Sequence, residues 1–280
     1  MDLRRIKTIF IFILIAINIM LAFVLVSEKN SRSEEKKIIT QNLSGLLEKN
    51  MIYLPEALEI PDSPDISSFY LEKMFGSDAD MAEKFLGSNY TTDGSGRFES
   101  ETGVLSVDGN EFKFFRKNPS GSVSEFSEEA IEKLCRDEMS GFGMIPEVYE
   151  FSGFNFVEDG TRAIFTVKHD DAEFFDAYIF FDVSEKGVFA LSGKNIISEM
   201  NVAESNTPYF SVVSVLTDLV KNVRLDKNIS HTIVSIKPGY YIGRSEESYR
   251  NILAIPVWQI ATDKGLILHY DARSGQEIQE

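Results

Sequence analysis

The chain has 280 residues, of which 43% are hydrophobic and 26% are charged, and this composition excludes a disordered or collagen-like protein. Forty-four acidic residues against 28 basic ones give a net charge of −16 at neutral pH, which disfavours binding to nucleic acids and to anionic membrane or cell-wall surfaces. The single cysteine, Cys135, excludes an intrachain disulfide framework and any CxxC metal or redox site.

The first predicted element is a membrane-spanning helix over residues 8–26. This stretch contains no charged residue and no proline, and all of its residues except Thr8 and Asn18 are apolar. At ~1.5 Å per residue, a helix of this length matches the hydrocarbon core of a bilayer. A cleaved signal peptide is the alternative, but its apolar stretch would be shorter and would be followed by small residues at a cleavage site.

The membrane helix is predicted to place residues 1–7 in the cytoplasm and the bulk of the chain outside it, because a short basic tail usually leads a signal anchor. One face of this helix is the candidate partner-binding surface. It contains Ile11, Leu14, Asn18, Leu21 and Leu25. An amide at this depth prefers a hydrogen bond to another helix, although an asparagine that the bilayer simply tolerates is an equal alternative.

Residues 27–50 are predicted to continue as an amphipathic juxtamembrane helix, because apolar residues recur there at helical spacing. Residues 51–118 then form a first α+β unit. Its predicted elements are short strands near 57–60 and 67–74, a helix capped within 77–80 and ending at Leu86, and two hairpins from Arg97 onward.

The segment 119–124 contains proline, glycine and serine and is the predicted boundary to a second α+β unit over 119–280. This unit begins with a helix capped by Ser127, in which Cys135 is predicted to be a core residue. A second helix is predicted at 209–223, with Thr207 as its cap. The strands are predicted at 147–156, 162–169, 174–183, 230–242, 251–261 and 266–270.

Two stretches of the second unit, about 125–200 and 205–280, resemble each other. In each, a helix precedes an apolar strand, and an aromatic–aspartate pair then precedes a glycine turn. The matching residues are Phe181-Asp182 before Gly187 and Tyr270-Asp271 before Gly275. We expect each aspartate to cap its own turn and each glycine to supply a positive φ, so the pattern predicts two copies of a helix-plus-antiparallel-sheet module.

The common motifs of catalysis and cofactor binding, HExxH, Walker A, GxSxG and GxGxxG, are absent from the sequence. The three histidines lack the short spacing of metal ligands. The loop from Asn89 begins like a calcium loop but has Ser100 where the bidentate glutamate belongs. Adjacent acids such as Asp170-Asp171 and Glu246-Glu247 are interpreted as solvated faces. We therefore predict no catalytic, cofactor-binding or metal-binding residue.

The order of these elements resembles the YycI family over nearly the whole chain. The likeness rests on the basic lead Met1–Phe10, on Asn18 within the apolar helix, and on the closing segments Pro256–Trp258 and Tyr270–Gln276. The closing segments also resemble the PepSY module. The resemblance implies an α+β fold, in which an N-terminal transmembrane helix precedes antiparallel sheets with packed helices in tandem PepSY-like or YycH-like units.

The same resemblance implies a function without catalysis. Such a protein is a membrane-anchored extracytoplasmic regulator of a Gram-positive bacterium, which forms a heterodimer with a YycH-like protein. Together the two bind and modulate WalK (YycG), the essential sensor histidine kinase that controls cell-wall metabolism. A PepSY-like inhibitor or chaperone of an extracytoplasmic protease is the alternative, and a surface hydrolase that uses an acidic pair is a third hypothesis.

Overall fold

The computed structural model describes residues 18, 20, 37–58, 60–61, 68–123, 126–169, 172–203, 209–222, 224–226, 228–242 and 252–278. The chain divides into two compact units, each assembled from segments that are distant in the sequence. The first unit comprises Met1–Ile60, Val213–Val234 and Thr262–Gly265. The second unit comprises Pro61–Val212, Ser235–Ala261 and Leu266–Glu280.

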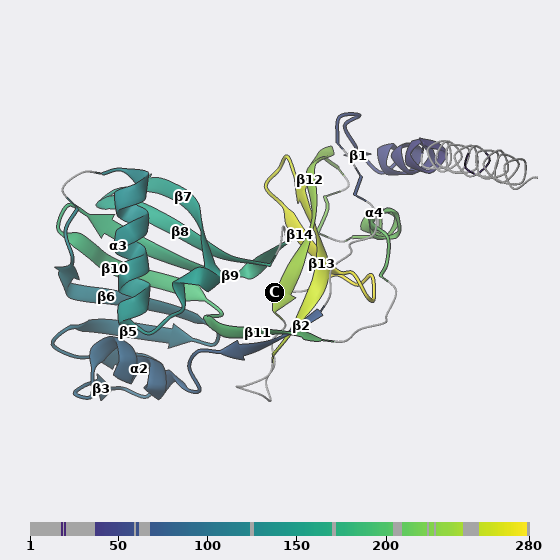
Figure 1. Ribbon diagram of the computed structural model, residues 1–280. Helices are drawn as coiled ribbons and strands as arrows, with labels where there is room; N and C mark the ends of the chain where they lie inside the picture. Colours follow the sequence, from purple (N-terminus) through teal and green to yellow (C-terminus); the bar gives the residue numbers. More distant parts are fainter. Residues whose placement is uncertain are drawn as a thin grey trace, which may run out of the picture. The chain divides into compact units, whose positions relative to one another are not determined.

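Strands dominate the described part of the chain (Figure 1). The helices are a segment over residues 37–48, α2 (Asp78–Leu86), α3 (Glu128–Gly141) and α4 (Val212–Leu219), with a 3₁₀ turn at Pro146–Val148. The strands are β1 (Ile52–Tyr53), β2 (Ser68–Lys73), β3 (Thr91–Thr92), β4 (Arg97–Glu99), β5 (Gly103–Asp108), β6 (Glu111–Ser120), β7 (Tyr149–Val157), β8 (Gly160–His169), β9 (Ala172–Ser184), β10 (Gly187–Lys194), β11 (Ile197–Ala203), β12 (His231–Ile242), β13 (Ile252–Thr262) and β14 (Ile267–Asp271).

Two backbone pairings connect the separate segments of the first unit. β1 pairs in parallel with the first residues of β12, so that Ile52 lies opposite His231. The backbone amide of Thr232 donates to the Asp263 carboxylate at 2.8 Å, and the amide of Asp263 donates to the Thr232 carbonyl at 2.8 Å. The hydrogen bond from Thr232 is the main reason that the pKa of Asp263 lies below its ordinary value.

The sheet of the second unit has the strand order β11-β2-β13-β12-β9-β10-β6-β5-β4-β3, with β14 beside β13 and β7 beside β8. The sheet divides at β9. On one side of β9, β8 pairs antiparallel along nearly the whole strand. On the other side, Glu173 and Phe174 pair in parallel with β12, whereas residues 178–184 pair antiparallel with β10.

Asp176 lies on β9 between the residues that pair with β12 and those that pair with β10. Its carboxylate accepts hydrogen bonds from the Ile242 amide at 2.8 Å and from the Asn195 side-chain amide at 3.2 Å. The same Asn195 group also donates to the backbone carbonyl of Asp176 at 2.9 Å. Because only 4% of Asp176 is exposed, these bonds replace the water that a buried carboxylate loses. The side chain therefore connects the ends of the two diverging strands.

The predicted fold class is wrong in its sheet arrangement. Successive units with antiparallel sheets of their own are not observed, because strands from both predicted stretches join one mixed sheet. β2 pairs with β11 and β13, and β6 pairs with β10. Two pairings, β9 with β12 and β1 with β12, are parallel. Alternating apolar residues identify a strand but contain no information about a distant partner, and this is the physical reason for the error.

The transmembrane helix of the predicted fold class is also corrected. Among the described residues, no helix is long and apolar enough to cross a membrane. Of the predicted span, only Asn18 and Met20 are described, and both are helical and exposed. The other residues of the predicted partner-binding face, Ile11, Leu14, Leu21 and Leu25, lie outside the described residues. Helix 37–48 is short and amphipathic, with Leu43 and Leu47 buried.

Two helices pack on the same face of the second unit's sheet. The predicted N-caps are confirmed, since the Ser77 and Ser127 hydroxyls accept hydrogen bonds from Asp80 N and Ala130 N. α3 contacts β7, β8 and β10, and α2 contacts β5 (Figure 1). The predicted core position of Cys135 is confirmed, and burial raises the pKa of its thiol.

Most other predicted elements are confirmed, including the hairpins from Arg97, and the ends of the strands predicted in the second half of the chain agree within two residues. The strand predicted at 57–60 is wrong, because the described residues there form a turn in which Leu58 N donates to Pro55 O. The helix predicted at 209–223 is shorter, extending over Val212–Leu219. Its predicted cap, Thr207, lies outside the described residues.

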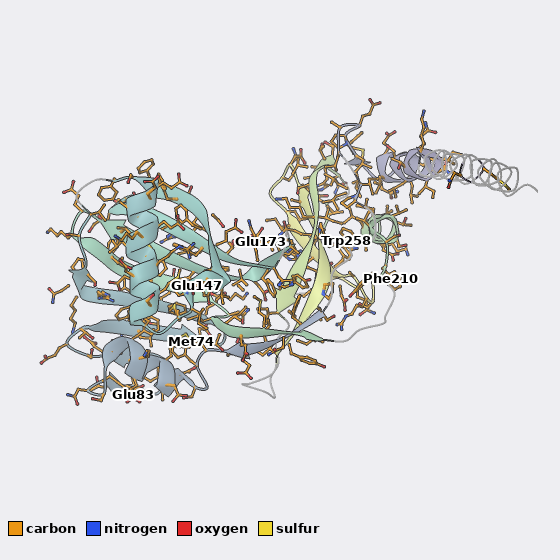
Figure 2. The ribbon with its side chains drawn as sticks, viewed as in Figure 1. Met74, Glu83, Glu147, Glu173, Phe210 and Trp258 are labelled. Carbon is orange, nitrogen blue, oxygen red and sulfur yellow. The ribbon has the colours of Figure 1, made fainter. Side chains whose placement is uncertain are left out.

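The fully buried Trp258 attaches the segment before α4 to β13. Its indole Nε1 donates a hydrogen bond to the backbone carbonyl of Phe210 at 3.0 Å (Figure 2). The Phe210 ring in turn covers Gly275, where an added Cβ would lie 3.1 Å from the ring edge. Gly275 has a φ of 70°, so this turn requires glycine for its backbone conformation and allows little room for a side chain.

Substitution of Phe85 tests the packing between α2 and the sheet. Its ring contacts those of Phe112, Phe114 and Phe142 at centroid distances of 5.4, 5.2 and 4.3 Å. We expect Phe85→Ala to lower the free energy of unfolding by about 3–5 kcal/mol, because it leaves a cavity among these rings. Urea unfolding followed by circular dichroism measures the loss. Phe156→Ala is the control, since Phe156 is 83% exposed, and an equal loss in both variants would contradict the assignment.

Substitution of Asp176 tests how the sheet is held together where it divides at β9. Asp176→Ala leaves the Ile242 amide and the Asn195 side chain without their acceptor, so we expect a loss of about 2–4 kcal/mol in the free energy of unfolding. Asp176→Asn keeps one acceptor oxygen and should lose less. The same urea titration measures both variants. Unchanged stability of Asp176→Ala would show that these hydrogen bonds are not needed.

Candidate functional site

The sheet face opposite α2 and α3 presents a row of side chains across six strands. Residues paired on neighbouring strands point to the same face, so the strand register identifies the row. We call it the open row, and it consists of Arg162 (β8), Asp182 (β9), Ala190 (β10), Phe115 (β6), Val104 (β5) and Glu99 (β4). The adjacent row, Ala163, Phe181, Leu191, Phe114, Leu105 and Phe98, points to the helices and is buried.

The centre of the open row is apolar, and Phe115 is its exposed residue. Phe115 is 54% exposed, whereas its neighbour Phe114 is 1% exposed. Beside Phe115 lies a hollow of about 390 Å³, which is lined in part by the small residues Ala190, Ser192 and Gly193. Tyr178 and Phe180 also line the hollow, with their rings stacked at a centroid distance of 4.7 Å. Small residues below aromatic ones leave room for a side chain of a partner.

An ion pair between Arg162 and Asp182 lies at one end of the open row. The Arg162 guanidinium donates to both carboxylate oxygens of Asp182, with distances of 2.7 and 2.9 Å, and lies 5.7 Å from the Phe180 ring centroid. The hydrogen bond to Asp182 raises the pKa of Arg162 above its ordinary value. This bidentate geometry orients a charged, planar group on the surface.

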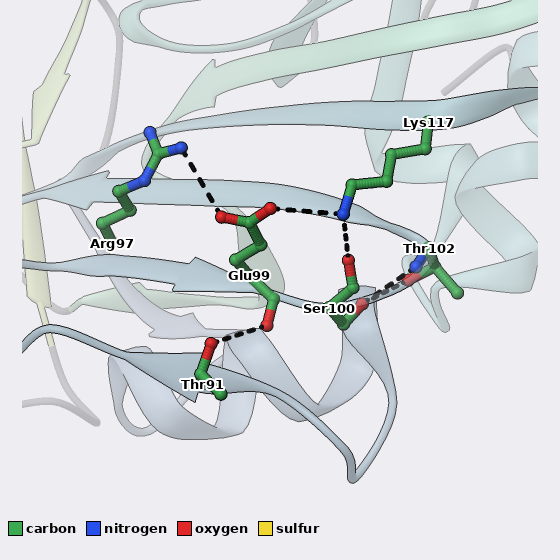
Figure 3. A network of polar contacts seen from close by, with 6 residues as sticks. All are labelled: Thr91, Arg97, Glu99, Ser100, Thr102 and Lys117. Atoms are coloured by element: carbon green, nitrogen blue, oxygen red, sulfur yellow. Dashed lines mark hydrogen bonds and ion pairs between the residues drawn. The ribbon is translucent and has the colours of Figure 1, made fainter.

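The other end of the open row is a polar network at Glu99 (Figure 3). The Glu99 carboxylate pairs with Lys117 at 3.2 Å and with Arg97 at 3.9 Å, and Lys117 donates to the Ser100 carbonyl at 2.8 Å. The three charged side chains are about half exposed. A second hollow of about 530 Å³ lies beside Arg97 and shares Lys113 with the first hollow. The open row thus has an apolar centre between two charged ends.

The predicted roles of the two aspartates have different outcomes. Asp271 caps its turn as expected, because it accepts a hydrogen bond from Arg273 N at 2.7 Å and Gly275 has a positive φ. The prediction for Asp182 is wrong. β9 continues to Ser184, so Asp182 lies within a strand, where it faces Arg162 on β8.

The described residues contain no group of three or more His, Cys, Asp or Glu side chains that could hold a metal ion. The calcium-like loop from Asn89 is a local turn, in which Asp93 accepts hydrogen bonds from the amide and hydroxyl of Ser95 at 2.9 and 2.6 Å. These bonds lower the pKa of Asp93. The acids Asp170-Asp171 and Glu246-Glu247 lie outside the described residues.

Comparison with known proteins shows limited similarity. No family model and no curated protein match the chain. A crystal structure of an uncharacterized protein from Eubacterium rectale is similar with 12% identity and a TM-score of 0.49, covering 86% of this chain and 99% of that one. The C-terminal domain of YpeB from Bacillus megaterium is similar with 8% identity and a TM-score of 0.34, covering 75% and 100%. At these values neither structure supports a conclusion about function, and membership of the YycI family stays a prediction.

The ion pair of the open row is expected to contribute little to stability. Its arginine side chain is 41% exposed and its aspartate side chain 14% exposed, and ion pairs in contact with water contribute at most about 1 kcal/mol in most cases. We therefore expect Asp182→Asn and Arg162→Lys to unfold within about 1 kcal/mol of the unmodified chain in urea. A loss as large as that expected for Phe85→Ala would instead give the pair a structural role.

Proposed function

We propose that the chain is a binding protein, not an enzyme, and that it regulates a partner protein through the open row. The observation that carries this proposal is the exposed Phe115 beside a hollow, flanked by ion-paired Arg162 and Glu99. Protein interfaces combine an apolar centre that is rich in aromatic residues and arginine with a polar rim. The open row has this composition and order.

The partner class comes from the sequence resemblance. We propose that the partner is the sensor histidine kinase WalK, bound together with a YycH-like protein, and that the two compact units act outside the cytoplasm. The support is the likeness of Met1–Phe10, Pro256–Trp258 and Tyr270–Gln276 to the YycI family. Regulation by occupancy of a surface needs no catalytic group and no cofactor.

Binding measurements with matched variants test this proposal. The extracytoplasmic part of the sensor kinase and the YycH-like protein from the same bacterium are each immobilised, and the full chain is applied. We expect Phe115→Ser to weaken binding by roughly 5- to 100-fold, because a central aromatic residue contributes about 1–3 kcal/mol to an interface. Phe126→Ser is the control, since this phenylalanine is 42% exposed and lies just before α3, outside the open row.

Kinase autophosphorylation in reconstituted membranes gives the functional measurement. We expect the unmodified chain and the Phe126→Ser control to change the phosphorylation rate, and Phe115→Ser to have a reduced effect. Equal effects of all three proteins would show that the chain does not act on the kinase through the open row. Inhibition of a purified cell-surface protease, with no binding to the kinase, would instead favour the alternative function.

A further inference from the structure

The outer edge of β7 has no strand partner among the described residues. β7 pairs with β8 alone, and its register after the bulge runs from Gly153 opposite Ile164 to Val157 opposite Gly160. The bulge lies between Phe151 and Gly153, where Gly153 has a φ of 117°. Residues 153–157 therefore form a short regular stretch of strand, which we call the β7 edge. On its outer side the backbone amides and carbonyls have no ladder partner in the described part of the chain.

Apart from the bulge that precedes it, the β7 edge lacks the side chains that usually protect such edges. Natural edge strands are kept short or contain lysine, proline or an inward-pointing charge, and β3, at one end of the sheet, has only Thr91 and Thr92. β7 has nine residues without lysine or proline. Phe156 is 83% exposed, and its ring packs edge-on with the Phe154 ring at a centroid distance of 5.7 Å. Backbone groups and apolar surface are thus available together.

We propose that the β7 edge accepts an extended, lysine- or arginine-rich segment of a partner protein as an added β-strand. This proposal does not depend on the function assigned to the open row. In strand addition, main-chain hydrogen bonds provide affinity and alternate side chains provide specificity. Apolar side chains of the added segment pack on Phe154 and Phe156, and its basic side chains meet the acids at the ends of β7.

Charge selects a basic segment over a second copy of the chain. Glu147 lies in the 3₁₀ turn just before β7, Glu150 is the second residue of β7, and Glu158 and Asp159 form the turn after the strand. Glu150 pairs with Lys168 at 2.8 Å. Two copies joined antiparallel through their β7 edges would place Glu158 and Asp159 of one copy beside the acids that begin β7 of the other. Each copy also has a net charge of −16, so self-association is disfavoured.

A peptide probe tests the proposal directly. The probe is a fluorescein-labelled peptide of seven alternating lysine and valine residues, and its matched control has the same sequence with alternate backbone amides N-methylated. Fluorescence anisotropy with the full chain at physiological salt measures both affinities. We expect the N-methylated peptide to bind at least tenfold more weakly, because it keeps its charge but loses its backbone donors. Equal binding would mean attraction by net charge alone and would overturn the proposal.

Variants of the chain locate the binding site. Replacing both turn acids, Glu158→Lys with Asp159→Lys, should weaken peptide binding at least tenfold, whereas Glu101→Lys with Glu185→Lys is the control with the same change of charge at two other exposed turns. Phe156→Ser should also weaken binding, and Phe115→Ser should not. If Phe115→Ser weakened peptide binding and Phe156→Ser did not, the peptide would bind on the open row, and the proposal would be overturned.

Hydrogen exchange provides a second measurement that does not depend on a variant. Bound peptide should slow the exchange of backbone amides within residues 153–157 of the full chain. Slowed exchange in β11 instead, at the opposite end of the sheet order, would overturn the proposal. Light scattering should show one chain and one peptide in the complex, and a dimer of chains would overturn the choice of partner.

Discussion

The buried carboxylate of Asp176 is the interaction on which the branched sheet depends. A strand that changes partners along one side leaves backbone groups of the departing strands unpaired, and unpaired buried groups are costly. At β9 this need is met by one side chain, which accepts from the Ile242 amide and from the Asn195 side chain. Asn195 has a φ of 50°, a conformation that asparagine tolerates better than most residues. The branch thus requires two particular polar residues as well as apolar packing.

The same sheet serves two purposes because alternate residues of each strand face opposite sides. Phe114 and Phe181 pack under α2 and α3, whereas their neighbours Phe115 and Phe180 face away from the helices. One set of strand pairings therefore determines both the core and the candidate binding surface. Substitutions on the open row should change recognition without changing the fold, and this separation is the condition for a regulatory surface that can adapt to its partner.

Local features could be predicted from the sequence, and features that depend on distant pairing could not. The caps of α2 and α3 follow from Ser77 and Ser127 and their immediate neighbours. The parallel pairing of Phe174 with Tyr240 joins residues far apart in the chain and has no local signal. The open row was not predicted, because its residues come from six strands. Adjacent phenylalanines such as Phe114-Phe115 and Phe180-Phe181 were an available signal, since a strand must direct one of each pair away from the core.

The single tryptophan of the chain gives the molecule a built-in optical reporter. Trp258 is fully buried, and its indole is hydrogen-bonded to the backbone of Phe210, so its emission depends on the environment inside the second unit. Separation of the segment at Phe210 from β13 would expose the indole to water and shift its fluorescence to longer wavelength. The chain therefore reports the opening of one of its two units spectroscopically, without any added label.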